Sequence, residues 1–282
     1  MSDYHRGAVD LVALDLDGVV WRGDRLLPGA AAALGEVVRR GLALRYVTNN
    51  STAHRQEVAR RLAGYGLPAG EGLVITSGFV TARWLKDRLR PRAPVLVVGE
   101  EGLLRELEEV GLLPVRAVEA AADVRVAAVV VGMDRDFCYG SLAAAQEALL
   151  RDEVLFVATN RDNTFPTSTG LLPGAGAIVA AVAAAAGREP VVMGKPSLAL
   201  AEVLAAESGV PSARTMFVGD RLTTDVAMGK AAGMITCLVL SGVTGKGEVE
   251  KARAEGVAVL LPDHVLEGLD ELPALLDTLG VG

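Results

Sequence analysis

The stretch "ALDLDGV", residues 13–19, decides how the rest of this sequence is interpreted. It ends an apolar run that begins at Val9, and a run this rich in Val, Leu and Ala is typical of a buried parallel strand. Asp15 and Asp17 stand at its end, one residue apart. An Asp-Gly turn explains Asp17, but Asp15 belongs to the buried run. Because burying unbalanced carboxylates costs several kcal/mol, the alternative is a divalent cation site with a carboxylate nucleophile.

The same alternation of short β-branched runs and longer amphipathic runs continues along the chain. This pattern predicts an α/β fold, a doubly wound and mainly parallel sheet with helices on both faces. The expected helices include Pro28–Arg40, Ser51–Ala63 with Ser51 or Thr52 as its cap, Pro196–Ser208 and Thr224–Ala232. The expected strands are Leu11–Asp15, Ala43–Val47, Leu73–Thr76, Pro94–Val98, Ala127–Val131, Val154–Ala158, Val191–Met193, Thr215–Val218, Ile235–Leu240 and Val257–Leu261.

Composition excludes several classes of function. The 282 residues carry a net charge of −7 with no long Lys/Arg block, which argues against nucleic-acid binding. The longest apolar stretch, Ala175–Ala186, is too short for a membrane span, and the N-terminus lacks the layout of a signal peptide. Cys138 and Cys237 are expected to be buried and reduced. We therefore expect a cytoplasmic protein without a nucleic-acid or membrane partner.

Three further polar clusters follow apolar strands: "TNNS" at 48–51, "GKP" at 194–196 and "GDRLTTD" at 219–225. Each has an ordinary explanation, as a helix cap, a solvated lysine or a helix first turn. Parallel strands, however, bring their carboxyl ends to one edge, where ligands bind. There, free N–H groups near Thr48 and the compact charge of Lys195 suit a phosphate, and Asp220 suits a metal. Asp225 would then be the neighbour of Asp220 or the partner of Lys195.

Other motifs are set aside. "GVTGKG" at 242–247 lacks the spacing of a P-loop, and "GAGAIV" at 174–179 lacks the third glycine of a dinucleotide fingerprint. The three histidines have no clustered partners, which argues against a zinc site, and His54 is expected to be an exposed helix residue.

Taken together, Asp15-x-Asp17-Gly18-Val19, Thr48, Lys195 and Gly219-Asp220-x4-Asp225 resemble the four motifs of the haloacid dehalogenase (HAD) superfamily of phosphohydrolases. The segment 159–196 is similar to the subfamily of NagD-type, p-nitrophenyl, phosphoglycolate and pyridoxal phosphatases. The resemblance implies a Rossmann-like core of residues 1–79 and 182–282. A C2-type α/β cap, residues 80–181, would be inserted into it. The expected strands between Pro94 and Ala158 then fall in this cap, although the pattern alone would put them in the main sheet.

The resemblance also implies a role for each motif. Asp15 would be the nucleophile that forms an aspartyl-phosphate, and Asp17 the general acid and base. Mg²⁺ would be bound by Asp15, the Asp17 backbone carbonyl and Asp220, with Asp225 supporting the site. Lys195 would bind both the phosphoryl group and Asp15. The remaining phosphate ligands would be Thr48 and the backbone of Asn49 and Asn50.

Selectivity would come from the cap, whose loops offer Asp134, Asp136, Asn160, Asp162 and Phe165. In the pyridoxal phosphatase relative a His lies near the position of Phe165, so this chain departs from that pattern. Phe165 would either pack in the cap core or form an apolar wall over the substrate.

The expected function is a Mg²⁺-dependent phosphatase that hydrolyses a small phosphorylated metabolite, in a chain that could form a homodimer. A phosphotransferase or mutase would use the same intermediate with another acceptor. A phosphoacceptor signalling module is a different class, but its acidic pair is not in a D-x-D arrangement and it has no inserted cap. A catalytically inactive binding protein is disfavoured, because every expected chemical group is present.

Overall fold

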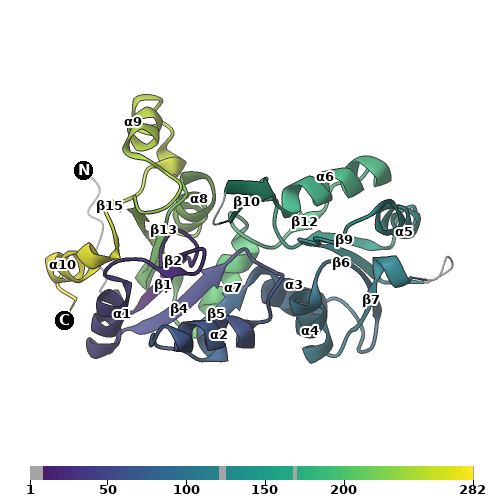
Figure 1. The fold of residues 1–282 in the computed structure, drawn as a ribbon, viewed down its shortest axis with the longest axis horizontal. Coiled ribbons are helices and arrows are strands. Elements are labelled where there is room, and N and C mark those ends of the chain that lie inside the picture. The colour runs from purple at the N-terminus through teal and green to yellow at the C-terminus, as the bar shows by residue number, and fades with distance from the viewer. Residues whose placement is uncertain (1–8, 121–124, 168–169, 282) are drawn as a thin grey trace. The chain divides into compact units, whose positions relative to one another are not determined.

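The first apolar run forms strand β1 (Leu11–Leu14), and all its residues are buried. The structure is a computed structural model that describes residues 9–120, 125–167 and 170–281. β1 lies inside a six-stranded sheet of order β15-β14-β13-β1-β4-β5. It pairs in parallel with β4 (Ala43–Thr48) and β13 (Thr215–Gly219), so three strand ends meet at one edge (Figure 1). β14 (Ile235–Val239), β15 (His264–Leu266) and β5 (Val74–Thr76) complete this sheet.

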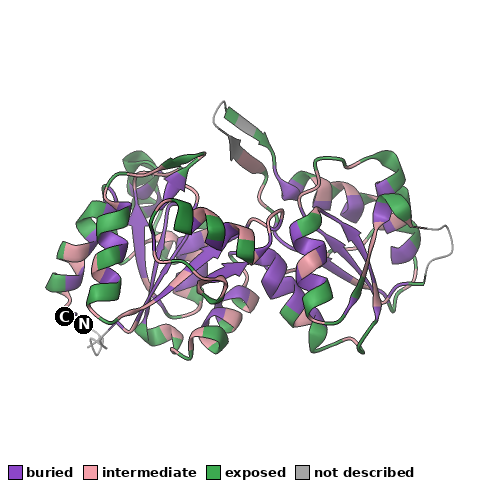
Figure 2. Ribbon diagram, turned by 60° about the horizontal axis from the view of Figure 1, so that its bottom comes forward, coloured by how far each residue is buried: buried purple, intermediate pink, exposed green. Residues whose placement is uncertain are grey.

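A second sheet has five strands in the order β12-β9-β8-β6-β7, and neighbouring strands in it pair in parallel. Its strands are β6 (Pro94–Val98), β7 (Leu113–Arg116), β8 (Ala128–Val131), β9 (Leu155–Ala158) and β12 (Val191–Val192). The three expected strands between Pro94 and Ala158 therefore lie outside the main sheet, as the resemblance implied. Figure 2 shows that the central strands of both sheets are buried.

Helices cover both sheets, and together the elements give the expected α/β class. The first sheet is accompanied by α1 (Ala30–Arg39), α7 (Leu198–Ser208), α8 (Ala227–Ala231), α9 (Lys246–Ala254) and α10 (Leu272–Thr278). The second is accompanied by α3 (Ser77–Lys86), α4 (Glu101–Glu109), α5 (Tyr139–Leu149) and α6 (Ala175–Ala186). Among the described residues, no helix has the length and apolarity that a bilayer span requires.

The chain divides into two compact units. The first consists of Met1–Thr48, Ala59–Val74 and Ala201–Gly282, and the second of Asn49–Val58 and Ile75–Leu200. Helix α2 (Arg55–Gly64) begins in the second unit and ends in the first. The core and cap boundaries implied by the resemblance, residues 1–79 with 182–282 and residues 80–181, stay a prediction.

Within the second unit, residues 49–54 run along the carboxyl edge of the five-stranded sheet. The N–H of Gly102 donates to the carbonyl of Thr52 over 3.1 Å. A Cβ on Gly102 would lie 2.4 Å from the carbonyl carbon of Ala53, and one on Gly132 would lie 2.8 Å from Oγ of Ser51. Glycine at these two positions thus allows the segment to lie directly against the sheet edge.

Two of the expected elements were wrong, and some elements were not predicted. The helix expected at Ser51 begins at Arg55, because Asn50 Oδ1 accepts the N–H and hydroxyl of Thr52 and holds a turn there. The run Val257–Leu261 forms a short 3-10 helix at Ala258–Leu260, and the edge strand follows at β15. The sequence pattern also failed to predict β7 and the hairpin of β10 (Thr164–Thr167) and β11 (Gly170–Pro173).

Candidate active site

Three carboxylates gather at the carboxyl edge of the first sheet. Asp15 follows β1 and Asp220 follows its parallel neighbour β13. Asp225 lies in a single π-helical turn, Leu222–Val226, of a kind often found at functional sites. Each side chain offers an oxygen, and these oxygens lie within 4.8 Å of one another. Asp15 is 8% exposed, and Asp220 and Asp225 are each 1% exposed.

Asp225 holds the backbone that carries Asp220. Its Oδ2 accepts the N–H groups of Asp220 and Arg221, at 3.1 and 3.0 Å. A Cβ on Gly219 would lie 2.2 Å from Cβ of Asp225, so the close approach requires glycine. These contacts fit the supporting role that the resemblance implied for Asp225.

The donor set suits a hard divalent cation. Mg²⁺ prefers carboxylate oxygens together with water and phosphate oxygens. Three clustered carboxylates repel one another strongly when buried, and a cation between them removes that repulsion. On the chemistry of this donor set, the residues fit Mg²⁺.

Asp17 lies next to this cluster in sequence, and Trp21 holds its side chain. Trp21 Nε1 donates to Asp17 Oδ1 over 3.0 Å. The buried Trp21 ring is covered by the Arg61 guanidinium, 4.1 Å from the ring centroid. Sequence reasoning treated Trp21 as a packing residue and missed this contact, which has no sequence signature beyond a spacing of four residues.

In the second unit, Asn49 and Lys195 are held together. Lys195 is only 3% exposed, which excludes the interpretation as a solvated surface lysine. The side-chain amide of Asn49 hydrogen-bonds to the backbone of Lys195. Asn49 Nδ2 also lies 3.1 Å from Asp162 Oδ2. The carbonyl of Asn49 accepts from Ser77 Oγ and Asn160 Nδ2, at 2.6 and 2.8 Å.

The expected cap residues are placed differently from one another. Asn160 is buried, and its Oδ1 also accepts the N–H of Asp162 over 3.0 Å, so both ends of its amide serve the local structure. Phe165 is half-buried on the β10–β11 hairpin, opposite Leu172 and outside the five-stranded sheet. Asp134 is half-buried, and burial is the main cause that raises the pKa of its carboxyl. Asp136 is exposed.

The candidate residues are thus divided between the two units. The first unit carries Asp15, Asp17, Thr48, Asp220 and Asp225, with Thr48 buried at the end of β4. The second carries Asn49, Asn50, Asn160, Asp162, Phe165 and Lys195. In the first unit Asp15, Asp220 and Asp225 lie close together, and in the second unit hydrogen bonds join Asn49 to Asn160, Asp162 and Lys195.

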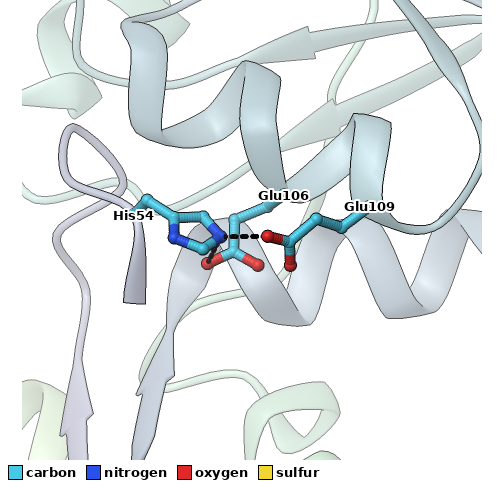
Figure 3. A group of neighbouring side chains, drawn as sticks. All are labelled: His54, Glu106 and Glu109. Atoms are coloured by element: carbon cyan, nitrogen blue, oxygen red, sulfur yellow. Dashed lines mark ion pairs between the residues drawn. The ribbon is translucent and has the colours of Figure 1, made fainter. Parts of the chain in front are cut away.

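A second cluster of possible ligands, His54, Glu106 and Glu109, lies within the second unit (Figure 3). The expectation of an exposed His54 was wrong, since it is 1% exposed and its Nδ1 accepts the N–H of Gln56 at the start of α2. His54 Nε2 lies 2.9 Å from Glu109 Oε1. Because Nδ1 is an acceptor, Nε2 carries the proton of the neutral ring.

Arg55 supplies the positive charge for this cluster. Its Nε lies 2.9 Å from Glu106 Oε2, and its Nη2 lies 3.0 Å from Glu109 Oε2. Burial raises the pKa of Glu106, whereas Arg55 and His54 act in the opposite direction. With the Arg55 guanidinium on both carboxylates, the contacts favour an ion-pair network over a metal site.

Comparison of the sequence with known proteins identifies the family of this chain. Residues 12–113 match the family described as haloacid dehalogenase-like hydrolase, and residues 192–272 match one described as HAD-hydrolase-like. The chain is 39% identical to glycerol-3-phosphate phosphatase of Gallus gallus, over 95% of this chain and 93% of that protein.

Solved structures agree with these matches. The p-nitrophenyl phosphatase from Archaeoglobus fulgidus superposes with a TM-score of 0.86 at 33% identity, covering 95% of this chain and 100% of that one. Glycerol phosphate phosphatase from Mycobacterium tuberculosis, crystallised with magnesium, superposes with a TM-score of 0.85 at 36% identity, covering 96% and 79%. The chain therefore belongs to the haloacid dehalogenase-like hydrolases, as a phosphomonoester hydrolase of the NagD-like and p-nitrophenyl phosphatase branch.

Proposed function

We propose that this phosphatase hydrolyses small phosphomonoesters with Asp15 as the nucleophile. The observation that carries the proposal is the cluster of Asp15, Asp220 and Asp225 at the ends of neighbouring parallel strands. A carboxylate oxygen of Asp15 attacks phosphorus, the bond to the leaving oxygen breaks, and an aspartyl-phosphate forms. Water then attacks the phosphorus of this intermediate, which releases inorganic phosphate and restores the carboxylate.

Mg²⁺ is the proposed cofactor, held by Asp15, the Asp17 backbone carbonyl and Asp220, with Asp225 in support. When bound, the cation offsets the negative charge that accumulates between nucleophile and phosphoryl group. The buried carboxylate oxygens supply the ligand type that Mg²⁺ prefers.

Asp17 is the proposed proton carrier. It donates a proton to the leaving oxygen in the first step and takes a proton from the attacking water in the second. The hydrogen bond from Trp21 Nε1 to Asp17 Oδ1 fixes the direction of this carboxyl group.

The phosphoryl group is proposed to bind Thr48, Lys195 and the backbone of Asn49 and Asn50. Lys195 supplies a compact positive charge, which suits phosphate oxygens. The side chain of Asn49 supports this role indirectly, because it fixes the backbone of Lys195.

The proposed substrate class is a small monoester with a hydroxylated or apolar leaving group. Similar proteins are named for glycerol phosphate and for p-nitrophenyl phosphate, which represent these two kinds of leaving group. Phe165 is proposed to determine specificity for the leaving group, since it is half-buried on a hairpin outside the sheet. A phosphotransferase would differ only in the acceptor. Homodimer formation and a cytoplasmic location stay predictions from the sequence.

Phosphate release from glycerol 3-phosphate, p-nitrophenyl phosphate and a bisphosphate tests the proposal, with Asp15→Asn as the decisive variant. We expect Mg²⁺-dependent turnover of the two monoesters and little turnover of the bisphosphate. Acid quenching of the wild type, followed by peptide mass spectrometry, should detect phosphate on Asp15. Substantial activity of a folded Asp15→Asn protein would refute the assignment of the nucleophile.

A further inference from the structure

Two glycines from distant parts of the sequence of the first unit lie directly against the carboxylate of Asp220. A Cβ on Gly18 would lie 2.3 Å from Asp220 Oδ2, and a Cβ on Gly242 would lie 2.0 Å from the same atom. Gly18 also has a φ of +86°, which favours glycine by itself. The Gly242 position has no such backbone requirement, so its need for glycine comes from the approach to Asp220 alone.

The loop that contains Gly242 also donates two hydrogen bonds to Asp220. The N–H of Val243 donates to Asp220 Oδ2 over 2.7 Å, and the N–H of Thr244 donates to the Asp220 carbonyl over 3.1 Å. A short bond between a backbone amide and a carboxylate is strong, and it fixes the rotation of the carboxylate about its terminal bond. Asp220 is 1% exposed, so this hydrogen bond is shielded from bulk solvent.

The same loop is tied to the segment that carries Asp17. Ser241 Oγ donates to the carbonyl of Gly18 over 2.9 Å. The Arg22 guanidinium donates to the carbonyls of Ser241 and Gly242. Residues 241–244, which we call the 241–244 loop, therefore connect the Asp220 side chain with the strand end after β1.

We propose that the 241–244 loop positions the metal ligand Asp220, with Gly242 and Val243 as positioning residues. The inference rests on the proposed function, because it takes Asp220 as a ligand of the cation. The motif "GVTGKG" fits no P-loop, and its first glycine instead allows a backbone N–H to reach a buried carboxylate. Displacing this loop moves Asp220, and a cation held by several carboxylates is sensitive to the position of each.

Gly242→Ala tests the proposal, with Gly247→Ala as the matched control. Both glycines belong to the same motif. Apart from its chain neighbours and the nearby backbone of its own helix, no described atom lies within 4 Å of a Cβ on Gly247. This position lies in the first turn of α9, where alanine is favourable. Asp220→Asn is the reference for loss of the ligand itself. Mn²⁺ binding to the substrate-free protein by electron paramagnetic resonance gives a readout independent of activity, and the Mg²⁺ dependence of turnover gives a second.

We expect Gly242→Ala to weaken Mn²⁺ binding and to raise the Mg²⁺ concentration for half-maximal turnover by roughly 10–100-fold. Gly247→Ala should match the wild type in Mn²⁺ binding and in the Mg²⁺ dependence of turnover. If Asp220→Asn binds Mn²⁺ as the wild type does, the proposed ligand set fails. If Asp220→Asn loses binding while folded Gly242→Ala retains it, the proposed function stands and the positioning role is refuted.

Ser241→Ala keeps the test valid where Gly242→Ala does not fold. It removes only the hydroxyl that bonds the Gly18 carbonyl and adds no atom. We expect a shift of roughly threefold to tenfold in the Mg²⁺ dependence, the size of one lost hydrogen bond. The kcat at saturating Mg²⁺ should recover. Unchanged Mg²⁺ dependence in this variant would contradict the connection between the loop and the metal site.

Discussion

Asn49 and Lys195 form a closed pair of hydrogen bonds between a side chain and a backbone. Asn49 Nδ2 donates to the carbonyl of Lys195 over 3.1 Å, and Asn49 Oδ1 accepts its N–H over 2.8 Å. A Cβ on Gly194 would lie 2.6 Å from Asn49 Oδ1, so the glycine before the lysine allows this approach. The side-chain amide of Asn49 thus bonds to both backbone groups of a residue 146 positions away, as the backbone of a neighbouring strand would.

We predict that Asn49→Ala lowers kcat/KM by about 10²-fold, because misplacing a catalytic group by about 1 Å has effects of this size. Mn²⁺ binding to the substrate-free protein should be unchanged. The double variant Asn49→Ala/Lys195→Ala should be no worse than Lys195→Ala alone, since Asn49 acts through Lys195. Additive losses would show that Asn49 has a separate role.

The Trp21–Asp17 hydrogen bond predicts an effect that depends on the leaving group. Asp17→Asn should reduce turnover of glycerol 3-phosphate by about 10²–10⁴-fold. It should reduce turnover of p-nitrophenyl phosphate less, because that leaving group needs little protonation. Trp21→Phe removes the N–H donor and leaves a smaller aromatic ring in its place, and it should show the same ordering with smaller losses. Steady-state kinetics with both esters measures the ratio, and equal losses would argue against proton transfer by Asp17.

Phe165 and Asn160 should behave differently when replaced by alanine. Phe165→Ala should change the ratio of kcat/KM between p-nitrophenyl phosphate and glycerol 3-phosphate, because an aromatic wall affects the two leaving groups unequally. Asn160→Ala should lower kcat/KM for both esters by the same factor, because its amide bonds Asn49 and Asp162. If Phe165→Ala also leaves the ratio unchanged, selectivity must come from residues of the first unit.

The ion-pair network predicts a pH-dependent loss of stability in Arg55→Met. This variant removes the partner of the buried Glu106, whose pKa burial already raises. A carboxyl whose pKa is raised in the folded state destabilises the fold only when it is ionised. The unfolding free energy therefore falls as the pH rises through that pKa. The loss in unfolding free energy should therefore be small at acidic pH, where the Glu106 carboxyl is neutral, and grow as the pH rises, to reach about 3–5 kcal/mol.

Arg105→Met is the matched control for this prediction. Arg105 pairs with Glu57 over 2.8 Å, and both side chains are partly exposed. We expect its removal to cost under about 1 kcal/mol with no pH dependence. Urea denaturation at several pH values measures both variants, and equal, pH-independent losses would contradict the role of Glu106.

The two cysteines should react at very different rates. Cys138 is exposed at the start of α5, and hydrogen bonds from Ser141 and Gly140 lower the pKa of its thiol. Burial raises the pKa of Cys237 to about 12. We predict that iodoacetamide alkylates native wild type once and native Cys138→Ser not at all, as measured by intact mass. Alkylation of Cys237 in the native protein would contradict its burial. The sequence analysis predicted that both cysteines are buried, which is correct for Cys237 and wrong for Cys138.

The sequence by itself determined the elements of the first sheet and the chemistry at their ends. β1, β4, β13 and β14 lie within a residue of their expected bounds, because a dense apolar run between turn residues is a local signal. Asp15 and Asp220 follow two of these strands, and parallel pairing brings them together. Short apolar runs carry a weaker signal, which is why Val257–Leu261 was mistaken for the edge strand.

Only the tertiary structure decided what the supporting side chains do. The alternation of strands and helices cannot show where one sheet ends and another begins, so the five-stranded sheet was not separable by pattern. His54 is buried because α4 covers it, and Asn49 bonds a backbone far along the chain. The need for glycine at Gly242 arises from a carboxylate 22 residues earlier, at Asp220. Such contacts join residues whose sequence separation carries no period, so they exist only once the chain has folded.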